Sequence, residues 1–273
     1  MTPVLIDTHA HLQDPKIIAD FDVVMARAEA AGIGMVVVPG YDLPSSRAAV
    51  ELAQRRPGSI FAAVGIHPHE ANSVGAEELE ELAALARAGQ VVAIGELGLD
   101  FYRDWARPEA QLRLLEGQLE LALQAGLPVS VHSRGAEDAI HEPLAAFARR
   151  ARAAGIACPG VMHCFGGTLE QALRYVELGF AVSIAGPVTY PKNDVARRLA
   201  AGLPARSLVI ETDSPYLPPQ GMRGKRNEPA LIVDTARTVA SCRGITFDEL
   251  AELTSENARR LFRLPRPIEA GSR

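Results

Sequence analysis

Short, almost continuously apolar runs recur along the chain, and longer segments with helical periodicity separate them. The apolar runs are residues 4–9, 34–40, 61–67, 91–100, 128–133, 160–165, 181–186 and 208–215. Runs that are this short and contain few polar positions are typical of strands in a parallel sheet covered on both faces. The segments between them predict the helices that cover it.

Three segments carry clear helix signals. Residues 76–89 and 107–126 are rich in Ala, Leu, Glu and Arg, and each ends in a glycine, Gly89 or Gly126, that predicts a C-cap. Residues 246–262 predict one more helix after the last strand. Thr246 would be its N-cap, and Glu249 would complete a capping box.

Eight strands that alternate with helices can close a barrel, and the 273 residues lie near the ~250 typical of one. We therefore predict an α/β protein, a (β/α)8 TIM-type barrel with an extra C-terminal helix. Residues 1–265 would form a single domain, because no linker or low-complexity segment divides them. Residues 266–273 would form a flexible tail.

The composition, with 48% hydrophobic and 22% charged residues, is typical of a globular protein. No apolar run approaches the ~20 residues of a membrane helix, and the first residues do not resemble a signal peptide. We expect a cytoplasmic protein that does not associate with membranes. The net charge of -5 argues against a wide basic face for duplex nucleic acid, but it leaves room for a local cationic site.

Polar residues able to bind metals fall at the ends of the predicted strands. They are His9, His11, His67, Glu96, His132, His163 and Asp213. The carboxyl ends of barrel strands meet at one mouth, where active sites of such barrels lie. Singly, a strand-end histidine is more often structural and a strand-end aspartate more often caps a turn. Together they would leave several unsatisfied polar groups, at roughly 1–3 kcal/mol each, which a bound metal would satisfy.

Imidazole and carboxylate ligands without thiolates fit Zn, Mn, Mg, Co or Fe. His9 and His11 are two positions apart in extended chain, so both can reach one ion. Asp7 would point the same way from deeper in the strand and orient a histidine. A two-metal site also needs a bridging anion. None of the three lysines, Lys16, Lys192 and Lys225, ends a strand, so Glu96 is the candidate.

Seven stretches, in order and spread over residues 6–229, resemble the TatD family of metal-dependent hydrolases in the amidohydrolase superfamily. They are IDTHAHL, VGIHPHE, IGELGLDFYRD, PVSVHSRGA, MHCFGG, ETDSPYLPP and RGKRNEP. The resemblance implies a TIM-type barrel with two divalent ions. By this resemblance the first ion would be bound by His9, His11, Glu96 and Asp213, and the second by Glu96, His132 and His163. It also implies deoxyribonuclease activity, commonly 3′ to 5′ exonuclease action.

We hypothesise that water activated by the two ions attacks phosphorus, while Asp213 orients this water and accepts its proton. Glu96 and Asp213 are thus the predicted catalytic residues. Arg134 could bind a phosphate through two parallel hydrogen bonds, although a structural salt bridge is the alternative. Further substrate contacts would come from Tyr102 and Arg223, and His67 would lie beside the site without binding metal.

Other residues of the same loops could contact nucleic acid or could be ordinary surface. The cations are Arg103, Lys225 and Arg226, and the aromatic residues are Phe101, Phe165 and Tyr216. Stacking on aromatic side chains favours single-stranded DNA ends as the substrate. His69 and His141 are expected to be exposed and without chemistry, and no obligate protein partner is evident.

The same metal site could serve other reactions. One alternative is a hydrolase of another ester, amide, lactone or small phosphoester, for example in aminoacyl-tRNA deacylation. The other is a non-catalytic scaffold stabilised by metal. A full ligand set together with a candidate base argues against the scaffold.

Overall fold

An eight-stranded parallel sheet forms the centre of the computed structural model, which describes residues 4–266. The strands follow one another around the sheet in chain order, each paired with the next. They are Leu5–Asp7 (β1), Ile33–Pro39 (β2), Ile60–Val64 (β3), Val91–Asp100 (β4), Val129–Arg134 (β5), Gly160–Met162 (β6), Ala181–Ile184 (β7) and Leu208–Ile210 (β8).

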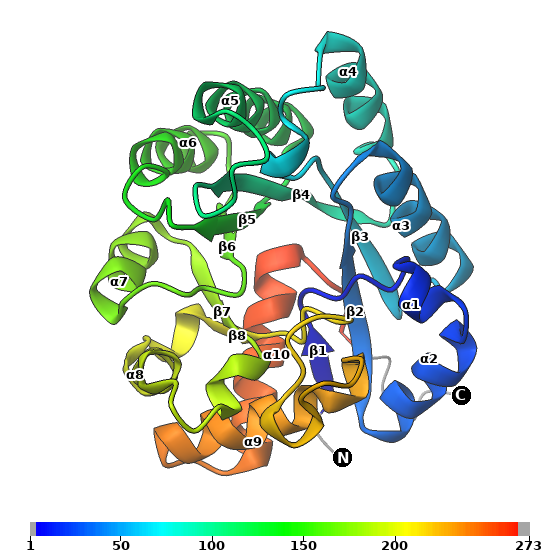
Figure 1. The fold of residues 1–273 in the computed structure, drawn as a ribbon, viewed down its shortest axis with the longest axis vertical. Coiled ribbons are helices and arrows are strands. Elements are labelled where there is room, and N and C mark those ends of the chain that lie inside the picture. Colours follow the sequence, from blue (N-terminus) through cyan, green and yellow to red (C-terminus); the bar gives the residue numbers. More distant parts are fainter. Residues whose placement is uncertain (1–3, 267–273) are drawn as a thin grey trace.

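Helices follow the strands, and all except the last form an outer ring around them (Figure 1). They are Pro15–Ile18 (α1), Phe21–Ala30 (α2), Leu43–Arg55 (α3), Ala76–Leu85 (α4), Pro108–Ala125 (α5), His141–Ala153 (α6), Leu169–Leu178 (α7), Asp194–Gly202 (α8), Ile232–Arg243 (α9) and Phe247–Phe262 (α10). This architecture confirms the predicted (β/α)8 TIM-type barrel.

The barrel closes between β8 and β1 through residues just beyond the two strands. The His11 amide donates to the Ser214 carbonyl at 2.7 Å, and the Asp213 amide donates to the His9 carbonyl at 2.9 Å. Three of these four residues carry predicted ligand side chains. The hydrogen bonds that close the barrel therefore also bring together side chains from opposite ends of the sequence.

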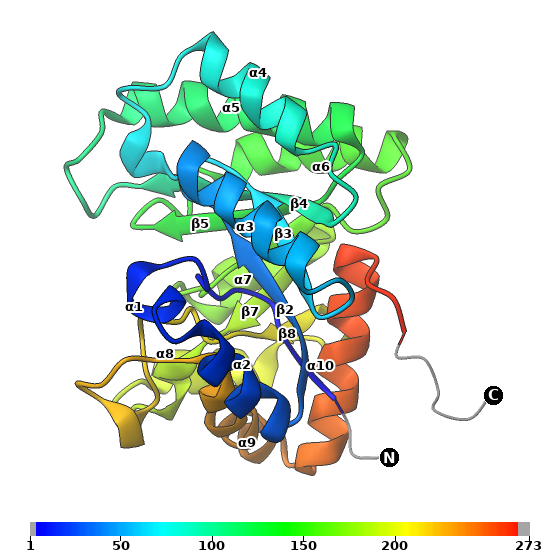
Figure 2. The ribbon, with the colours of Figure 1, turned by 90° about the vertical axis from the view of Figure 1, so that its right-hand side faces the viewer.

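The extra helix predicted after the last strand is α10, and its capping box between Thr246 and Glu249 is present. Its side chains Leu261 and Phe262 pack inside the barrel against inward-facing residues of the strands, including Ile6, Val37 and Val209. In Figure 2, α10 lies on the side away from α1 and from the loop after β8. The helix thus closes the end of the barrel opposite the mouth.

The two glycine C-caps have different outcomes. Gly126 ends α5 in a left-handed conformation, as predicted. The prediction for Gly89 is wrong, because α4 already ends at Leu85 with Ala86 as its C-cap. The next turn is tighter than an α-helix, because the Arg87 amide donates to the Ala84 carbonyl, three residues earlier.

Several predicted strands run too far at their carboxyl ends. β1, β3, β6 and β8 stop before the polar residues, which therefore lie in the loops that follow. There the backbone bonds to neighbouring loops or strands: the His67 amide, for example, donates to the Tyr41 carbonyl at 2.8 Å. Glu96 was expected at the end of a strand, but β4 continues to Asp100, so Glu96 lies inside the strand. Of the predicted tail, residues 267–273 lie outside the described residues.

Candidate metal centre

Glu96 lies at the centre of the histidine cluster, and its two carboxylate oxygens face different groups. Oε2 lies 3.4 Å from Nε2 of His9 and 3.6 Å from Nε2 of His11. Oε1 lies 2.9 Å from Nδ1 of His132 and 2.9 Å from Nε2 of His163. The carboxylate is buried. It stands between two sets of potential ligands, as a bridging anion would.

Asp213 completes the first set. Its Oδ1 lies 3.6 Å from Nε2 of His11 and 3.9 Å from Nε2 of His9. His9, His11 and Asp213 form one group of donor atoms that could hold an ion, and His9, Glu96 and His163 form another. All six residues predicted as ligands thus meet at the mouth of the barrel.

The spacing of the imidazole nitrogens fits a shared cation. Two nitrogen ligands at 2.0–2.1 Å from a tetrahedral ion lie about 3.3 Å apart. Nε2 of His9 and Nε2 of His11 are 3.3 Å apart, and so are Nδ1 of His132 and Nε2 of His163. Without an ion, one ring of each pair would have to donate its N–H to the nitrogen of the other, whereas an ion between them would use both nitrogens as ligands. The residues present therefore fit divalent metal ions.

The electrostatics of the cluster agree with this. Burial by itself would raise the pKa of Glu96, but the surrounding imidazoles, His163 first, hold that pKa well below its usual range. Burial lowers the pKa of His9, and it lowers that of His11 to about 4, so both rings are neutral at neutral pH. Burial would also lower the pKa of His132 and His163, but the neighbouring carboxylates, Glu96 among them, raise it. The buried carboxylates thus favour positive charge beside them, and a bound cation would supply that charge.

Close packing between β4 and β5 requires a glycine at position 98, two residues after Glu96. Gly98 has φ 146°, and a side chain there would collide with the carbonyl of His132 on β5. This contact holds the strand that carries Glu96 against the strand that carries His132, in a register that pairs Gly98 with His132. Gly98 is thus required for the strands that carry Glu96 and His132 to pack this closely.

Two buried carboxylates that sequence analysis had given no role contact the ligand imidazoles. Oδ2 of Asp100 lies 3.3 Å from Nε2 of His132, which directs Nδ1 of that ring toward Glu96. Oε1 of Glu211 lies 3.4 Å from Nδ1 of His163. Carboxylates in these positions fix the orientation and tautomer of a ligand histidine. The sequence signal was their spacing: Asp100 is four positions from Glu96 in β4, and Glu211 is two positions from Asp213 in the segment after β8.

Asp7 does not orient an imidazole as predicted. Its carboxylate accepts hydrogen bonds from the His9 amide at 3.3 Å and from the Thr212 amide at 2.9 Å and hydroxyl at 2.6 Å. It points back toward β8 because the seam of the barrel needs an acceptor for these donors. Asp7 therefore fixes the backbone at His9 and at Thr212, which precedes Asp213.

The remaining histidines differ from expectation in part. His67 lies beside the site, as predicted, with Nε2 3.5 Å from Oε1 of Glu96, and it shares a group of potential ligand atoms with Glu96 and His132. The prediction that His69 is exposed is wrong, because its Nε2 lies 2.9 Å from Oδ2 of the buried Asp100. His141 is half-buried and its ring lies near Tyr175, so its predicted exposure is also wrong.

The predicted substrate-binding side chains lie at the rim of the mouth. Arg134 stands over the ring of Tyr102, with 4.0 Å from its guanidinium carbon to the ring centroid, and Arg134 forms no ion pair within residues 4–266. Arg223 stands similarly over Tyr190, at 4.9 Å. Tyr102 is 64% exposed and can contact a ligand.

Some of the additional candidates are excluded by their contacts. Phe165 is buried against the core, so it offers no surface for stacking. Arg226 forms a two-pronged ion pair with Asp20 at 2.7 Å and 2.8 Å and is not free for a phosphate. Trp105, which no sequence pattern had indicated, is 62% exposed, and its ring packs beside His69 at the same rim.

An eight-stranded barrel with a histidine–carboxylate cluster at the carboxyl ends of its strands defines a metal-dependent barrel hydrolase. The chain belongs to the TatD family: residues 6–263 match the family model described as TatD related DNase. Among residues 4–266, no helix combines the length and apolar character needed to cross a membrane.

Named relatives agree with this assignment. The chain is 37% identical to an uncharacterized metal-dependent hydrolase, YabD, of Bacillus subtilis, over 96% of this chain and 100% of that protein. It is also 37% identical to the 3′-5′ ssDNA/RNA exonuclease TatD of Erwinia billingiae, over 96% of this chain and 100% of that protein. The crystal structure of YjjV, a TatD homolog from Escherichia coli, matches with a TM-score of 0.89 and 34% identity, over 97% of this chain and 100% of that one. The protein is a metal-dependent hydrolase.

Proposed function

We propose that this protein is a deoxyribonuclease that uses two divalent ions to remove nucleotides from the 3′ ends of single-stranded DNA. The observation that carries the proposal is the position of Glu96, with one carboxylate oxygen toward His9 and His11 and the other toward His132 and His163. Two ions held about 3.5–4 Å apart are common in enzymes that cleave phosphodiesters. The Erwinia billingiae relative is named a 3′-5′ ssDNA/RNA exonuclease, which supports the same choice.

The chain supplies a proton acceptor beside the ions. When bound, the ions would activate a water molecule and stabilise negative charge on the phosphoryl oxygens. Asp213 directs Oδ1 at His9 and His11, whereas its Oδ2 forms no hydrogen bond or ion pair within the described residues. In the proposed reaction Oδ2 orients the attacking water and takes up its proton.

Positive side chains gather around the mouth although the protein carries a net charge of -5. The three lysines of the chain, Lys16, Lys192 and Lys225, all lie in segments that follow the carboxyl ends of strands, after β1, β7 and β8. Arg134 and Arg223 lie in the same zone. This distribution favours an anionic, extended substrate over a small neutral ester.

Exposed aromatic rings on the same rim favour unpaired bases. Tyr102 and Trp105, on the loop after β4, are each more than half exposed, and Arg103 lies over both rings at 5.4 Å and 5.6 Å. Bases stack on such rings only when they are free of a partner strand. The proposed substrate is therefore a single-stranded end.

A panel of substrates tests the proposal. The protein is purified without a histidine tag and supplied in turn with Mg²⁺, Mn²⁺, Zn²⁺ and Co²⁺. The substrates are single-stranded DNA labelled at either end, duplex DNA, single-stranded RNA, bis-p-nitrophenyl phosphate, and a set of simple esters and lactones. We expect single-stranded DNA to be degraded fastest, with immediate release of a 3′ label and a descending ladder from a 5′ label.

Two outcomes would contradict the proposal. Faster turnover of an ester, a lactone or an aminoacyl-tRNA would assign the site to carbonyl chemistry. Full activity in the presence of a chelator would exclude a role for the ions in the reaction.

A further inference from the structure

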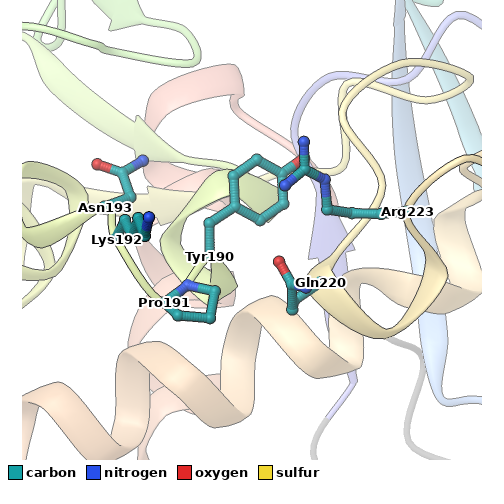
Figure 3. A pocket seen from close by; sticks show the side chains of 6 residues that line it. All are labelled: Tyr190, Pro191, Lys192, Asn193, Gln220 and Arg223. Atoms are coloured by element: carbon teal, nitrogen blue, oxygen red, sulfur yellow. The ribbon is translucent and has the colours of Figure 1, made fainter.

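A pocket of about 590 Å³ opens between the loop after β7 and the loop after β8. Its lining consists of Tyr190, Pro191, Lys192, Asn193, Gln220 and Arg223 (Figure 3). Both loops leave the carboxyl ends of their strands, at the mouth where Asp213 lies. The volume falls in the range of ~300–1,000 Å³ that small-molecule sites occupy.

Hydrogen bonds between the two loops fix the shape of this pocket. The Tyr190 hydroxyl donates to the Pro218 carbonyl at 2.9 Å, and the Gln220 amide donates to the Thr189 hydroxyl at 2.8 Å. Each bond joins the loop after β7 to the loop after β8. The pocket therefore exists before any ligand binds, which lowers the entropic cost of binding.

A second set of hydrogen bonds ties the pocket to the metal centre. The side-chain amide of the buried Asn227 donates to the Thr212 carbonyl at 2.9 Å and to the Tyr216 carbonyl at 2.6 Å. Arg223 lies between Tyr216 and Asn227 in the chain. The two hydrogen bonds hold Tyr216 and Asn227, at the two ends of this segment, close to Thr212, the residue before Asp213. A chain bound in the pocket is thus held in a defined position relative to the site of cleavage.

The lining carries positive charge and no carboxylate. Neither Lys192 nor Arg223 forms an ion pair within the part of the chain that the structure describes, and the Gln220 side-chain amide has no hydrogen bond there. Asn193, in contrast, is already used, since it accepts from the Ala196 amide and donates to the Pro187 carbonyl. The groups without an ion-pair or hydrogen-bond partner are thus Lys192, Arg223 and the Gln220 side-chain amide. The Arg223 guanidinium lies over one face of the Tyr190 ring, at 4.9 Å from its centroid, so a base would stack on the other face.

These groups match the parts of a nucleotide. An arginine and a lysine bind phosphate oxygens, a tyrosine ring stacks on a base, and an amide hydrogen-bonds to base edges or sugar hydroxyls. We infer that the pocket binds one nucleotide of the single-stranded substrate while another phosphodiester bond of the same strand lies at the metal centre. Lys192 and Arg223 would contact its phosphate and Tyr190 its base. This inference rests on the proposed nuclease function.

Removal of the two cations tests the phosphate contact. Arg223→Ala, Lys192→Ala and the double variant are compared with the wild type on a single-stranded DNA 12-mer and on bis-p-nitrophenyl phosphate. We expect the double variant to raise KM for the 12-mer by at least tenfold with kcat within threefold. KM for bis-p-nitrophenyl phosphate should change much less, because that compound has no further nucleotide to place in the pocket. Arg87→Ala is the matched control, since Arg87 is an exposed arginine between α4 and β4, at the other end of the barrel.

Salt dependence and substrate length give two independent readouts. Each lost phosphate contact should reduce the slope of log KM against log salt concentration by about 0.7. Across DNA lengths from two to twelve nucleotides, the effect of the double variant should be absent for the shortest and appear once the strand is long enough to reach the pocket.

Replacement of the ring tests the base contact. Tyr190→Leu should raise KM for the 12-mer by at least fivefold and by more than Tyr190→Phe does. Both variants lose the hydrogen bond to Pro218, but only the leucine variant loses the aromatic face. Equal effects of the two variants would show that Tyr190 only supports the loop.

The results separate failure of this inference from failure of the proposed function. Degradation of the 12-mer by the wild type, together with an unchanged KM and salt slope in the double variant, would overturn the pocket assignment alone. A wild type that hydrolyses bis-p-nitrophenyl phosphate but not single-stranded DNA at any length would overturn both.

Discussion

At the scale of single residues, the two oxygens of Glu96 and the carboxylates behind the histidines determine what the site can bind. Each oxygen of Glu96 faces a different pair of imidazoles. Behind them, Asp100 and Glu211 contact the far nitrogens of His132 and His163. The ligand rings are thus held before an ion arrives. Preorganisation of this kind raises metal affinity, since little conformational entropy is lost on binding.

Glu96→Ala tests the proposed bridge between two ions. We expect activity to fall at least 100-fold and the metal content to drop from close to two ions per chain to one or fewer, because the remaining ligands lose their shared anion. Metal analysis by mass spectrometry, together with the nuclease assay, measures both effects. Glu252→Ala, an exposed glutamate on α10, is the control. Near-normal turnover of Glu96→Ala would show that Glu96 does not bridge the ions.

Asp100→Asn should weaken metal binding without removing a ligand. The amide keeps the shape of the side chain but loses the charge that holds the His132 ring. Loss of such a partner typically costs 10–100-fold in metal affinity. Titration with a competing chelator measures this, and Asp104→Asn, an exposed aspartate on the same loop, should behave as the wild type. Equal affinities of the two variants would mean that Asp100 has no influence on the ligand.

At the scale of elements, the two ends of the barrel have separate tasks. The carboxyl ends of β4 and β5 and the loops around the mouth carry the candidate ligands and the rim, whereas α10 fills the other end. Leu261 and Phe262 of α10 contact the inward-facing residues of the strands. The Asn257 side-chain amide donates to the Ala205 and Leu208 carbonyls at the amino end of β8. Stability at this end should therefore be separable from chemistry at the mouth.

Phe262→Ala should destabilise the fold while sparing the site. Deletion of a buried phenylalanine side chain costs about 3–5 kcal/mol in free energy of unfolding. Denaturant unfolding gives this value, and metal content per folded chain should stay that of the wild type. A variant that unfolds normally but loses metal would contradict the separation of the two ends.

At the scale of the whole molecule, bound ions should stabilise the barrel, because their ligands come from β4, from β5 and from the segments after β1, β6 and β8. An ion bound by such ligands joins parts of the chain that separate on unfolding. Binding to the folded state alone, at a free concentration of 100 times Kd, adds about 2.7 kcal/mol to its stability.

Removal of metal should therefore lower Tm, and restoring the metal should raise it again. In calorimetry, we expect a chelator to shift the unfolding transition down by several degrees. A double variant, His9→Ala with His11→Ala, should retain one ion and show about half of the shift. A Tm that is independent of metal would contradict the bridging of distant segments by ions.

The sequence by itself determined the fold class and the residue types of the site. Eight apolar runs spaced by helices predict a closed barrel, and the order of strands around it places their carboxyl ends at one mouth. His9, His11, Glu96, His132, His163 and Asp213 could thus be assigned to one cluster without coordinates. Periodicity reports which residues are buried and on which side of a strand they lie, and this was sufficient to predict which side chains meet at the mouth.

Only the tertiary structure decided how these side chains are oriented and what surrounds them. The contact of Asp100 with His132, the direction of the Asp7 side chain toward Thr212 and the burial of Phe165 depend on packing between segments that are distant in sequence. The pocket around Tyr190 and Arg223 has the same origin, since it exists only where two loops meet. Local pattern indicates on which side of a strand a residue lies but not which partner it contacts, because such contacts arise from the closure of the barrel.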